Sequence, residues 1–508
     1  MKFNIKSVFT TKVKNYEKAD AYTMSPELEL YAAVVTASLS DTFYEKEQER
    51  MERIRALIAK VDTLFVAKLA AYTRQKMNLR SASLVLAVEL AKRANGNSIV
   101  KNTVNQVVQR ADEITDLLAY YELANKRTGT KRLNKLSKQI QKGLAMSFNK
   151  FDEYQFAKYN RDAAIKLRDA LFLVHPKAKD EAQQILFDKI AGNSLTVPYT
   201  WETNLSVLGQ TKFETEQAKK AAFGNKWEEM IASGKIGYMA MLRNLRNILE
   251  AEVSYNSIEK ICAYLSNAEN VAKSKQLPFR FLSAYRELKA IPSGCTSNVM
   301  RAIEDAVKAS AVNIKGYDAD QRIVLACDVS SSMQKPVSAR SKIMLYDIGL
   351  LLAMLLQSKS KNVITGMFGD RWKIINMPTG NILANVDEFY RREGEVGYST
   401  NGYLVIEDLI AKNKIVDKVM MFTDCQLWDS RNSGSSMENS WNRYKRVAPN
   451  AKLYLFDLAG YGNTPLNLVR HDIFLIAGWS DKIFDVLAAI ENGENALSEI
   501  KKMSIGVV

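Results

Sequence analysis

A carboxylate and several hydroxyls occur in close succession in the segment Asp328-Val329-Ser330-Ser331-Ser332. They follow directly on the aliphatic run 323–327, which is typical of a buried parallel strand. A strand of this kind delivers the residues after it to the C-terminal edge of a sheet, where open α/β sheets bind their ligands. The sequence therefore predicts a group of oxygen ligands at that edge.

Two later segments are placed to complete a site around Asp328. Thr400, with Ser399 beside it, precedes a predicted helix, and Asp424 follows the predicted strand 417–423. A hard divalent cation such as Mg²⁺ prefers an octahedron of oxygen ligands and keeps water or accepts a partner's oxygen. Because hydroxyls supply part of this shell, the ion stays electrophilic, which favours capture of an acidic group from outside over catalysis.

The segments that position these residues alternate between strands and helices from residue 321 onward. This alternation predicts a mostly parallel sheet covered by helices on both faces, an α/β domain over residues 321–508. The expected strands are 323–327, 362–368, 372–376, 417–423, 452–458 and 472–477, and the expected helices are about 339–357, 401–411, 439–447 and 480–490.

Residues 1–320 have the pattern of an almost wholly helical domain after a polar N-terminal arm. Ser25-Pro26-Glu27 combines a hydroxyl cap, a proline at the first helical position and an acid in the first turn. Helices with short breaks over this length predict a solenoid of stacked helical pairs, of the kind with repeats of ~40 residues. Residues 313–320, which include Gly316, are the expected linker to the α/β domain.

Charge is divided unevenly between the two expected domains. The net charge of the chain is +15, of which +13 falls in residues 1–320 and +2 in residues 321–508. A basic domain joined to a nearly neutral one indicates a polyanion partner for the basic part, most often nucleic acid. Solubility alone is the alternative explanation.

The cysteines and the apolar segments indicate the cellular compartment of the protein. Cys262, Cys295, Cys327 and Cys425 have neither metal-type spacing nor a disulfide framework, and they read as reduced, cytoplasmic thiols. The longest purely apolar segment, 348–356, is far shorter than the ~20 residues of a membrane helix, and the N-terminus has no signal-peptide core. The sequence predicts a cytoplasmic protein without a membrane association.

The cation-site residues resemble those of a known family. Asp328, Ser330, Ser332, Thr400 and Asp424 are similar to the metal-ion-dependent adhesion site of von Willebrand factor A domains, and the resemblance covers about residues 321–508. The threonine loop departs from the family pattern because it reads Gly397-Tyr398-Ser399-Thr400-Asn401, without a glycine pair before the threonine. Ser399 and Thr400 therefore remain alternative ligands.

The helical part resembles a TROVE module, the helical part shared by telomerase, Ro and vault proteins. The resemblance begins with Asn15-Tyr16-Glu17, residues 31–36 and residues 40–45. It continues in the expected order through residues 107–113, Lys142-Gly143-Leu144, 154–159, 167–169, 175–177 and 242–245. A TROVE module followed by an A domain is the layout of the Ro autoantigen (Ro ribonucleoprotein) family, including bacterial and phage relatives.

The Ro resemblance implies a ring of HEAT-like helical repeats that is closed by the A domain. It also implies that single-stranded ends of misfolded noncoding RNAs enter the ring cavity, while structured Y RNA lies on the basic outer surface. Duplex RNA is too wide to thread such a cavity and is recognised by its backbone and shape, whereas a single strand can be gripped by its phosphates.

Basic residues are the candidates for these RNA contacts. One stretch resembles the outer RNA-binding region of the family and contains Lys158, Arg161, Lys166, Arg168 and His175. The remaining candidates are Lys142 in a neighbouring segment and, for the cavity, Arg243, Arg246 and Arg280. A solvated helix face is the alternative for each cation, Arg243 with Asn244 could equally pair helices, and a lone histidine beside a proline is typical of a helix-end cap.

Three classes of function follow from these patterns. The first is a monomeric, noncatalytic RNA-binding protein that scaffolds Y RNA-like RNA and takes in RNA ends, with an exoribonuclease tethered through the RNA. The second is a metal-dependent docking module in which the A domain captures an acidic partner. A Mg²⁺-dependent nuclease is disfavoured, because only Asp328 and Asp424 converge and two-metal hydrolysis needs several carboxylates.

Overall fold

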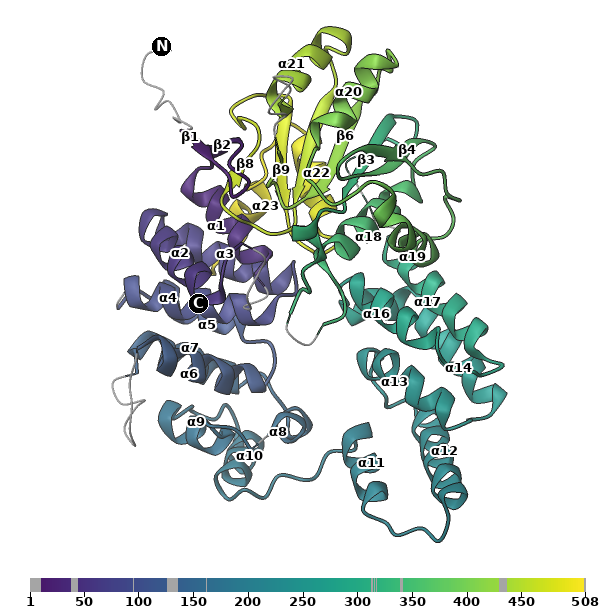
Figure 1. The fold of residues 1–508 in the computed structure, drawn as a ribbon. Helices are drawn as coiled ribbons and strands as arrows, with labels where there is room; N and C mark the ends of the chain where they lie inside the picture. The colour runs from purple at the N-terminus through teal and green to yellow at the C-terminus, as the bar shows by residue number, and fades with distance from the viewer. Residues whose placement is uncertain are drawn as a thin grey trace. The chain divides into compact units, whose positions relative to one another are not determined.

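The computed structural model describes residues 11–37, 44–94, 96–125, 136–160, 162–311, 314, 316, 318–338, 341–428 and 436–506. The chain forms two compact units, and Figure 1 shows its ribbon coloured from the N-terminus to the C-terminus. Unit 1 contains Met1–Leu57, Cys262–Ala290 and Thr296–Glu499, and unit 2 contains Ile58–Ile261, Ile291–Cys295 and Ile500–Val508. The predicted domain boundary at residue 320 stays a prediction. The two compact units do not divide there, because unit 1 combines the N-terminal segment with most of the C-terminal part of the chain.

The core of unit 1 is a six-stranded sheet. Its strand order is β5-β4-β3-β6-β7-β9, and each neighbouring pair is parallel except β4 with β5. The strands are β3 (Arg322–Asp328), β4 (Asn362–Phe368), β5 (Trp372–Ile374), β6 (Lys418–Thr423), β7 (Lys452–Asp457) and β9 (Ile473–Ala477). The predicted mostly parallel sheet is thus confirmed, with β5 as an antiparallel edge.

Helices cover both faces of this sheet, so that every residue of β3 after Arg322 is buried. Helix α18 packs on β3 and β6, while α1 and α22 pack on β9. The helices of unit 1 are α1 (Pro26–Val35), α15 (Ala268–Ser274), α16 (Phe279–Leu288), α17 (Thr296–Ser310), α18 (Leu345–Gln357), α19 (Leu383–Arg392), α20 (Tyr403–Ala411), α21 (Met437–Val447) and α22 (Ile483–Glu491), with short 3₁₀ turns at Ser331–Gln334 and Glu393–Glu395. Helix α19 was not predicted.

The N-terminal arm folds against the C-terminal part of unit 1. Strands β1 (Lys12–Lys14) and β2 (Asp20–Thr23) form a hairpin, and β2 pairs antiparallel with β8 (Asn463–Thr464). The hydroxyl of Tyr31 on α1 donates a hydrogen bond of 2.8 Å to the carbonyl of Ala477 at the end of β9. The sequence predicted only a polar N-terminal arm, and the pairing of β2 was missed because its partner β8 lies more than 400 residues later in the chain.

Unit 2 is helical throughout its described residues, apart from the connecting segments. Its helices are α3 (Thr63–Gln75), α4 (Arg80–Arg93), α5 (Ile99–Val107), α6 (Asp112–Ala124), α7 (Lys138–Phe148), α8 (Glu153–Tyr159), α9 (Leu167–Val174), α10 (Glu181–Ala191), α11 (Trp201–Gly209), α12 (Glu216–Ala232) and α13 (Tyr238–Glu250). Three further helices span the residues where the chain passes between the units, namely α2 (Glu47–Lys60), α14 (Tyr255–Ser266) and α23 (Ser498–Lys501). The predicted succession of packed helices is confirmed.

Close packing of α5 against α7 explains the segment Lys142-Gly143-Leu144, which is one of the segments that resemble a TROVE module. A Cβ atom on Gly143 would lie 2.6 Å from Cβ of Val104 and 2.7 Å from the carbonyl oxygen of Lys101. Only glycine fits at this crossing without moving a backbone. Leu144 is buried beside it, and Lys142 is exposed. The segment 142–144 is therefore a packing element that leaves its lysine in solvent.

Candidate functional site

The predicted cation-site residues lie on three loops of unit 1 that contact one another. Asp328, Ser330, Ser332, Thr400 and Asp424 are all buried, with at most 4% of their surface exposed. The amide of Ser331 donates to the carbonyl of Tyr398 at 3.1 Å, and the amide of Trp428 donates to the carbonyl of Thr400 at 3.0 Å. These backbone bonds tie the loops after β3 and β6 to the loop before α20.

Hydrogen bonds orient the Asp328 carboxylate. Its Oδ1 accepts from the amide of Ser330 at 3.0 Å, and its Oδ2 accepts from the hydroxyl of Thr423 at 2.7 Å. The hydroxyls of Ser330 and Ser332 lie 3.2 Å apart. The motif after β3 therefore forms a compact set of oxygens whose position is fixed by the strand and by its neighbour β6.

Two buried oxygens near this set have no hydrogen-bond partner among the described residues. They are Oδ2 of Asp424 and the hydroxyl of Thr400. A buried polar atom without a partner costs about 1–3 kcal/mol, which a bound cation would offset at these two oxygens. Ser399 is less buried, and its amide bonds to Asp370 at 3.1 Å, so the geometry supports Thr400 of the two alternatives. The oxygens fit a hard divalent cation.

Burial also changes the acidity of the two site carboxylates. It raises the pKa of Asp328 to about 6, although hydrogen bonds from Ser330 and Thr423 oppose the shift. It raises the pKa of Asp424 to about 8, and the nearby charge of Asp328 adds to this effect. A divalent cation between them would offset both causes by stabilising the ionised carboxylates.

The N-terminal part of unit 1 adds residues to this region that were not predicted. The hydroxyl of Tyr44 donates to Glu17, which also accepts from the indole of Trp428. The pKa of Tyr44 is raised by burial, by Glu17 and by the charge of Asp424, so its hydroxyl lies near the site. Asn15 donates to the carbonyl of Leu427 at 2.8 Å. The segment Asn15-Tyr16-Glu17 was recognised in the sequence, but its place beside the cation site depends on pairing with the far end of the chain.

The described RNA-binding candidates of unit 2 are exposed on or beside α7, α8, α9 and α13, and the structure shows which of them have acidic partners. Lys166 lies 2.9 Å from Asp162, and Arg246 lies 3.8 Å from Glu250. Lys142, Lys158, Arg168, His175 and Arg243 are also exposed. Arg161 lies outside the described residues. The candidates of unit 2 therefore differ in whether a neighbouring carboxylate already offsets their positive charge, which would weaken their attraction for a phosphate.

Two of the remaining candidates have a local structural context. His175 ends α9 in the left-handed conformation, with φ 50° and its amide bonded to the carbonyl of Leu171, which agrees with the alternative of a helix-end cap. Arg280 is on α16 in unit 1, where its guanidinium lies 5.0 Å from the ring centroid of Phe279. Neither residue lies at the cavity described next.

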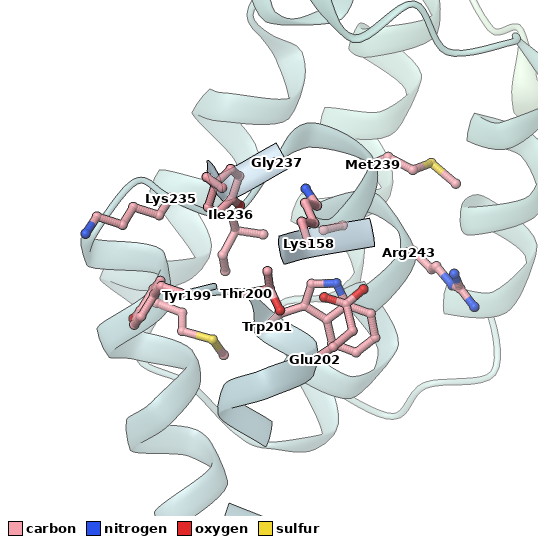
Figure 2. Close-up of a pocket in the computed structure, with 13 residues that line it drawn as sticks. Lys158, Tyr199, Thr200, Trp201, Glu202, Lys235, Ile236, Gly237, Met239 and Arg243 are labelled. Atoms are coloured by element: carbon pink, nitrogen blue, oxygen red, sulfur yellow. The ribbon is translucent and has the colours of Figure 1, made fainter. Parts of the chain in front are cut away.

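Lys158, which was predicted for the outer surface, and Arg243, which was predicted for the ring cavity, line the same small cavity of unit 2, shown in Figure 2. The cavity measures about 130 Å³ and adjoins a second one of about 410 Å³, with which it shares Lys158, Thr200 and Glu202. Aromatic and further basic side chains complete the lining, among them Tyr154, Tyr199, Trp201 and Lys235. Sequence analysis missed these four, although the closely spaced pair Tyr199 and Trp201 was a signal.

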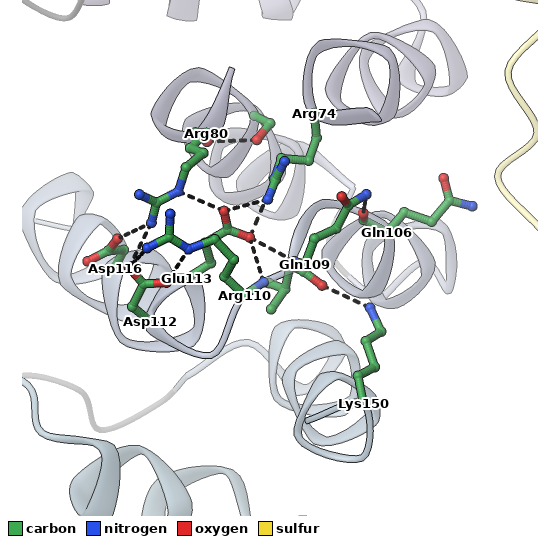
Figure 3. A network of polar contacts seen from close by, with 11 residues as sticks. Arg74, Arg80, Gln106, Gln109, Arg110, Asp112, Glu113, Asp116 and Lys150 are labelled. Atoms are coloured by element: carbon green, nitrogen blue, oxygen red, sulfur yellow. Dashed lines mark hydrogen bonds and ion pairs between the residues drawn. The ribbon is translucent and has the colours of Figure 1, made fainter. Parts of the chain in front are cut away.

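A separate charged cluster of unit 2, shown in Figure 3, joins α3, α4, α6 and the loop between α5 and α6. Glu113 is fully buried and accepts from Arg74 at 2.8 Å and from Arg80 at 2.9 Å. Its other oxygen accepts from the amides of Gln109 and Arg110 at 2.7 and 3.1 Å. These arginines are paired with carboxylates. We therefore interpret segment 107–113, which is part of the TROVE resemblance, as a segment that stabilises the fold.

Among the described residues, no helix combines the length and apolarity that a membrane span requires. No group of three or more histidine, cysteine or acidic side chains that could hold a metal occurs in the described part of the chain. The Asp328 site has two carboxylates and otherwise hydroxyls, so it does not count as a group of three histidine, cysteine or acidic side chains.

Comparison with known proteins gives sequence matches over about half of the chain or more. A model of the TROVE domain matches residues 21–226 and 191–315. Telomerase protein component 1 of Rattus norvegicus is 24% identical over 341 residues, and the Mus musculus protein is 25% identical over 325 residues. The matched segments are 50% and 48% of this chain and 12% of each relative's own length.

One solved structure has a similar fold over nearly the whole chain. The crystal structure of the Deinococcus radiodurans Ro (RSR) protein aligns with a TM-score of 0.59 and 17% identity, covering 92% of this chain and 100% of that one. At this identity the match shows the fold alone. Because the TROVE model covers more than half of the sequence, the chain belongs to the TROVE domain family, with the fold of a Ro protein.

Proposed function

We propose that this protein binds RNA without modifying it. In this proposal, small noncoding RNA of the Y RNA kind lies on its outer surface, and single-stranded ends of misfolded or structured RNAs enter a cavity of a closed ring. Membership of the TROVE family and the net charge of +13 in residues 1–320 support the proposal. The cellular role would be RNA quality control or ribonucleoprotein assembly by a cytoplasmic monomer, with an exoribonuclease tethered through the RNA.

The observation that carries this proposal is the pairing of cations with aromatic rings at one cavity. Lys158 and Arg243 line it without an ion pair to any carboxylate among the described residues. Tyr154, Tyr199 and Trp201 lie beside them. Cations for phosphates next to aromatic faces for bases are what single-stranded nucleic acid needs.

An electrophoretic assay tests the proposal with two RNAs that share one duplex, one blunt and one with a single-stranded 3′ tail. We expect tighter binding of the tailed RNA and a steep loss of affinity between about 50 and 200 mM salt, because phosphate contacts release counterions. Lys158→Gln and Arg243→Gln should each reduce the salt slope, whereas Lys212→Gln, at an exposed lysine between α11 and α12, should not. Equal binding of the two RNAs would remove the cavity from the proposal, and no binding at 50 mM salt would remove RNA binding altogether.

A second candidate function is cation-dependent docking at the Asp328 site, in the manner of a von Willebrand factor A domain. The buried oxygens of Asp424 and Thr400 that have no hydrogen-bond partner among the described residues support it. Asp328, Ser330, Ser332, Thr400 and Asp424 would hold Mg²⁺ or another divalent cation, which would supply an electrophilic position for a carboxylate. Since these residues are buried, an acidic partner from outside reaches the ion only if neighbouring residues move.

The two candidate functions are separated by one variant of the full-length chain. Asp328→Ala should abolish Mg²⁺-dependent capture of an acidic peptide and leave RNA affinity unchanged. Loss of RNA affinity in this variant, with the fold intact by circular dichroism, would contradict the separation. Incubation of the purified protein with labelled RNA and Mg²⁺ should give no discrete cleavage products, and their appearance would overturn the noncatalytic proposal.

A further inference from the structure

The aromatic cavity of unit 2 is formed by α8, the start of α11, the end of α12 and the start of α13. Thr200 caps α11 by accepting a hydrogen bond from the amide of Thr203 at 3.2 Å. This cap fixes Trp201 at the first position of the helix, where it lines the cavity. Figure 2 shows Trp201 and Glu202 close to Lys158 in the middle of the site, with Arg243 and Lys235 on opposite sides.

The cations around this cavity are free to meet a ligand. Lys158 lies 5.7 Å from the ring centroid of Tyr154, and Lys235 lies 5.2 Å from that of Tyr199. Within the described ranges, neither lysine nor Arg243 is within ion-pair distance of a carboxylate, in contrast to Lys166 and Arg246. Cations that stack on rings and lack acidic partners suit a ligand with both negative charge and flat aromatic groups.

Glu202 distinguishes this cavity from a simple anion site. Among the residues that line the two adjoining cavities, it is the only acidic side chain. A carboxylate would repel a bound phosphate, but it can accept hydrogen bonds from a base edge that presents donors. Guanine offers adjacent N1–H and N2–H donors that match both carboxylate oxygens, while the N3–H of uracil stands between two carbonyl oxygens.

We propose that this cavity holds one unpaired RNA nucleotide and prefers guanine to uracil. The base stacks on Trp201, its donor edge faces Glu202, and the adjoining phosphates contact Lys158 and Arg243. A base within a duplex already uses that edge for pairing, so the site takes only nucleotides of single-stranded segments. The adjoining cavity of about 410 Å³ is within the range of about 300–1,000 Å³ that holds small ligands, and it gives room for the neighbouring nucleotide. This inference rests on the proposed RNA-binding function and names the recognised group.

The test is fluorescence anisotropy of the full-length protein with two labelled single-stranded RNAs, an oligouridine and the same oligomer with guanosines at its centre. We expect the guanosine-containing RNA to bind more tightly. Trp201→Leu, which keeps an apolar side chain but removes stacking, should weaken its binding by about 5- to 160-fold, and Trp201→Phe should retain most of it. Glu202→Gln should bring the ratio of the two affinities close to one without weakening the binding of oligouridine.

Lys212→Gln serves as the matched surface control, and thermal unfolding followed by circular dichroism shows that each variant is folded. If Lys158→Gln and Arg243→Gln weaken binding while Trp201→Leu does not, the nucleotide pocket is wrong and RNA binding stands. Equal affinity of the wild-type protein for the two RNAs overturns the guanine preference. Absence of binding to either RNA overturns the proposed function together with this inference.

Discussion

The hydroxyl of Thr423 donates a hydrogen bond of 2.7 Å to Oδ2 of Asp328, so both oxygens of this buried carboxylate have protein donors. Asp424 differs, because its Oδ1 accepts from the amide of Gln426 at 2.9 Å, while its Oδ2 has no hydrogen-bond partner within the described part of the chain. The two site carboxylates are therefore held by unequal sets of hydrogen bonds. Asp424 presents the free oxygen, and Asp328 presents an oriented one.

This inequality leads to a prediction about metal binding. Saturating Mg²⁺ should raise the melting temperature of the full-length protein, because a cation that binds only the folded state at 100 times its Kd adds about 2.7 kcal/mol of stability. Asp424→Asn should abolish this shift, as measured by differential scanning fluorimetry. Asp417→Asn, which removes a carboxylate at the opposite end of β6, should keep it. A full Mg²⁺ shift in Asp424→Asn would show that the site does not hold the ion.

The charged cluster around Glu113 should govern stability and leave RNA binding unchanged. Glu113→Gln removes the buried charge that pairs with Arg74 and Arg80, and breaking a buried pair costs about 3–5 kcal/mol. Urea unfolding followed by circular dichroism measures this loss. RNA affinity at a temperature where the variant is folded should equal that of the wild type. A selective loss of RNA affinity would reassign this cluster to the RNA-binding surface.

The crossing of α5 and α7 should not tolerate a methyl group. Gly143→Ala places Cβ where Val104 and Lys101 already lie, and overpacking of this kind typically costs about 1–3 kcal/mol. Gly209 in α11 is the matched control, because no atom lies within 4 Å of a Cβ added there. Gly209→Ala should be stabilising by about 0.4–1 kcal/mol. The two variants should shift the urea midpoint in opposite directions, and equal shifts would contradict the packing argument.

A buried ion pair at the start of the inner strand β6 should make stability depend on acid pH. Lys418, which is 2% exposed, lies 2.8 Å from Glu491, and Glu491→Gln leaves its charge unpaired at a cost of about 3–5 kcal/mol. Burial alone would raise the pKa of Glu491, but hydrogen bonds from Lys418 and Tyr454 outweigh it and lower the pKa. Glu491 therefore contributes stability above its unfolded pKa of about 4.3, and this contribution is lost as pH falls through the folded value.

Unfolding by urea across pH measures this contribution. The difference in unfolding free energy between the wild type and Glu491→Gln should be full at pH 7 and should shrink as the pH falls below about 4, where Glu491 becomes protonated. Asp408→Asn, in an exposed pair with Lys412, should change stability by about 0.3–0.5 kcal/mol at most. A difference that is independent of pH would rule out the ionised pair as its source.

Local sequence patterns were sufficient for the parallel sheet, because each central strand is an apolar run followed by turn residues. They were insufficient for α19, whose N-terminal residues carry no local cap. The amides of Ile382 and Leu383 donate instead to Glu304 on α17, which is some 80 residues earlier in the chain. A cap supplied from such a distance cannot be read from the helix sequence itself.

The sequence predicted some residues of the candidate sites and missed others. The oxygens of Asp328, Ser330 and Ser332 are adjacent in sequence, so their motif was sufficient to identify them. Tyr44 and Glu17 approach the same region only because the N-terminal arm pairs with β8. The aromatic residues that accompany Lys158 and Arg243 come from connections and helix starts, where ring clusters carry no periodic signal.

The pairing of β2 with β8 places a constraint on the order of events during synthesis. Tyr22 faces Thr464 across this ladder, so the first strand waits for a partner that emerges 442 residues later. At translation rates of about 5–20 residues per second, the delay is roughly 20–90 s. During that interval α1 lacks the sheet that buries it, so a nascent chain at this stage is exposed to aggregation and to chaperone binding, and unit 1 can be completed only near the end of translation.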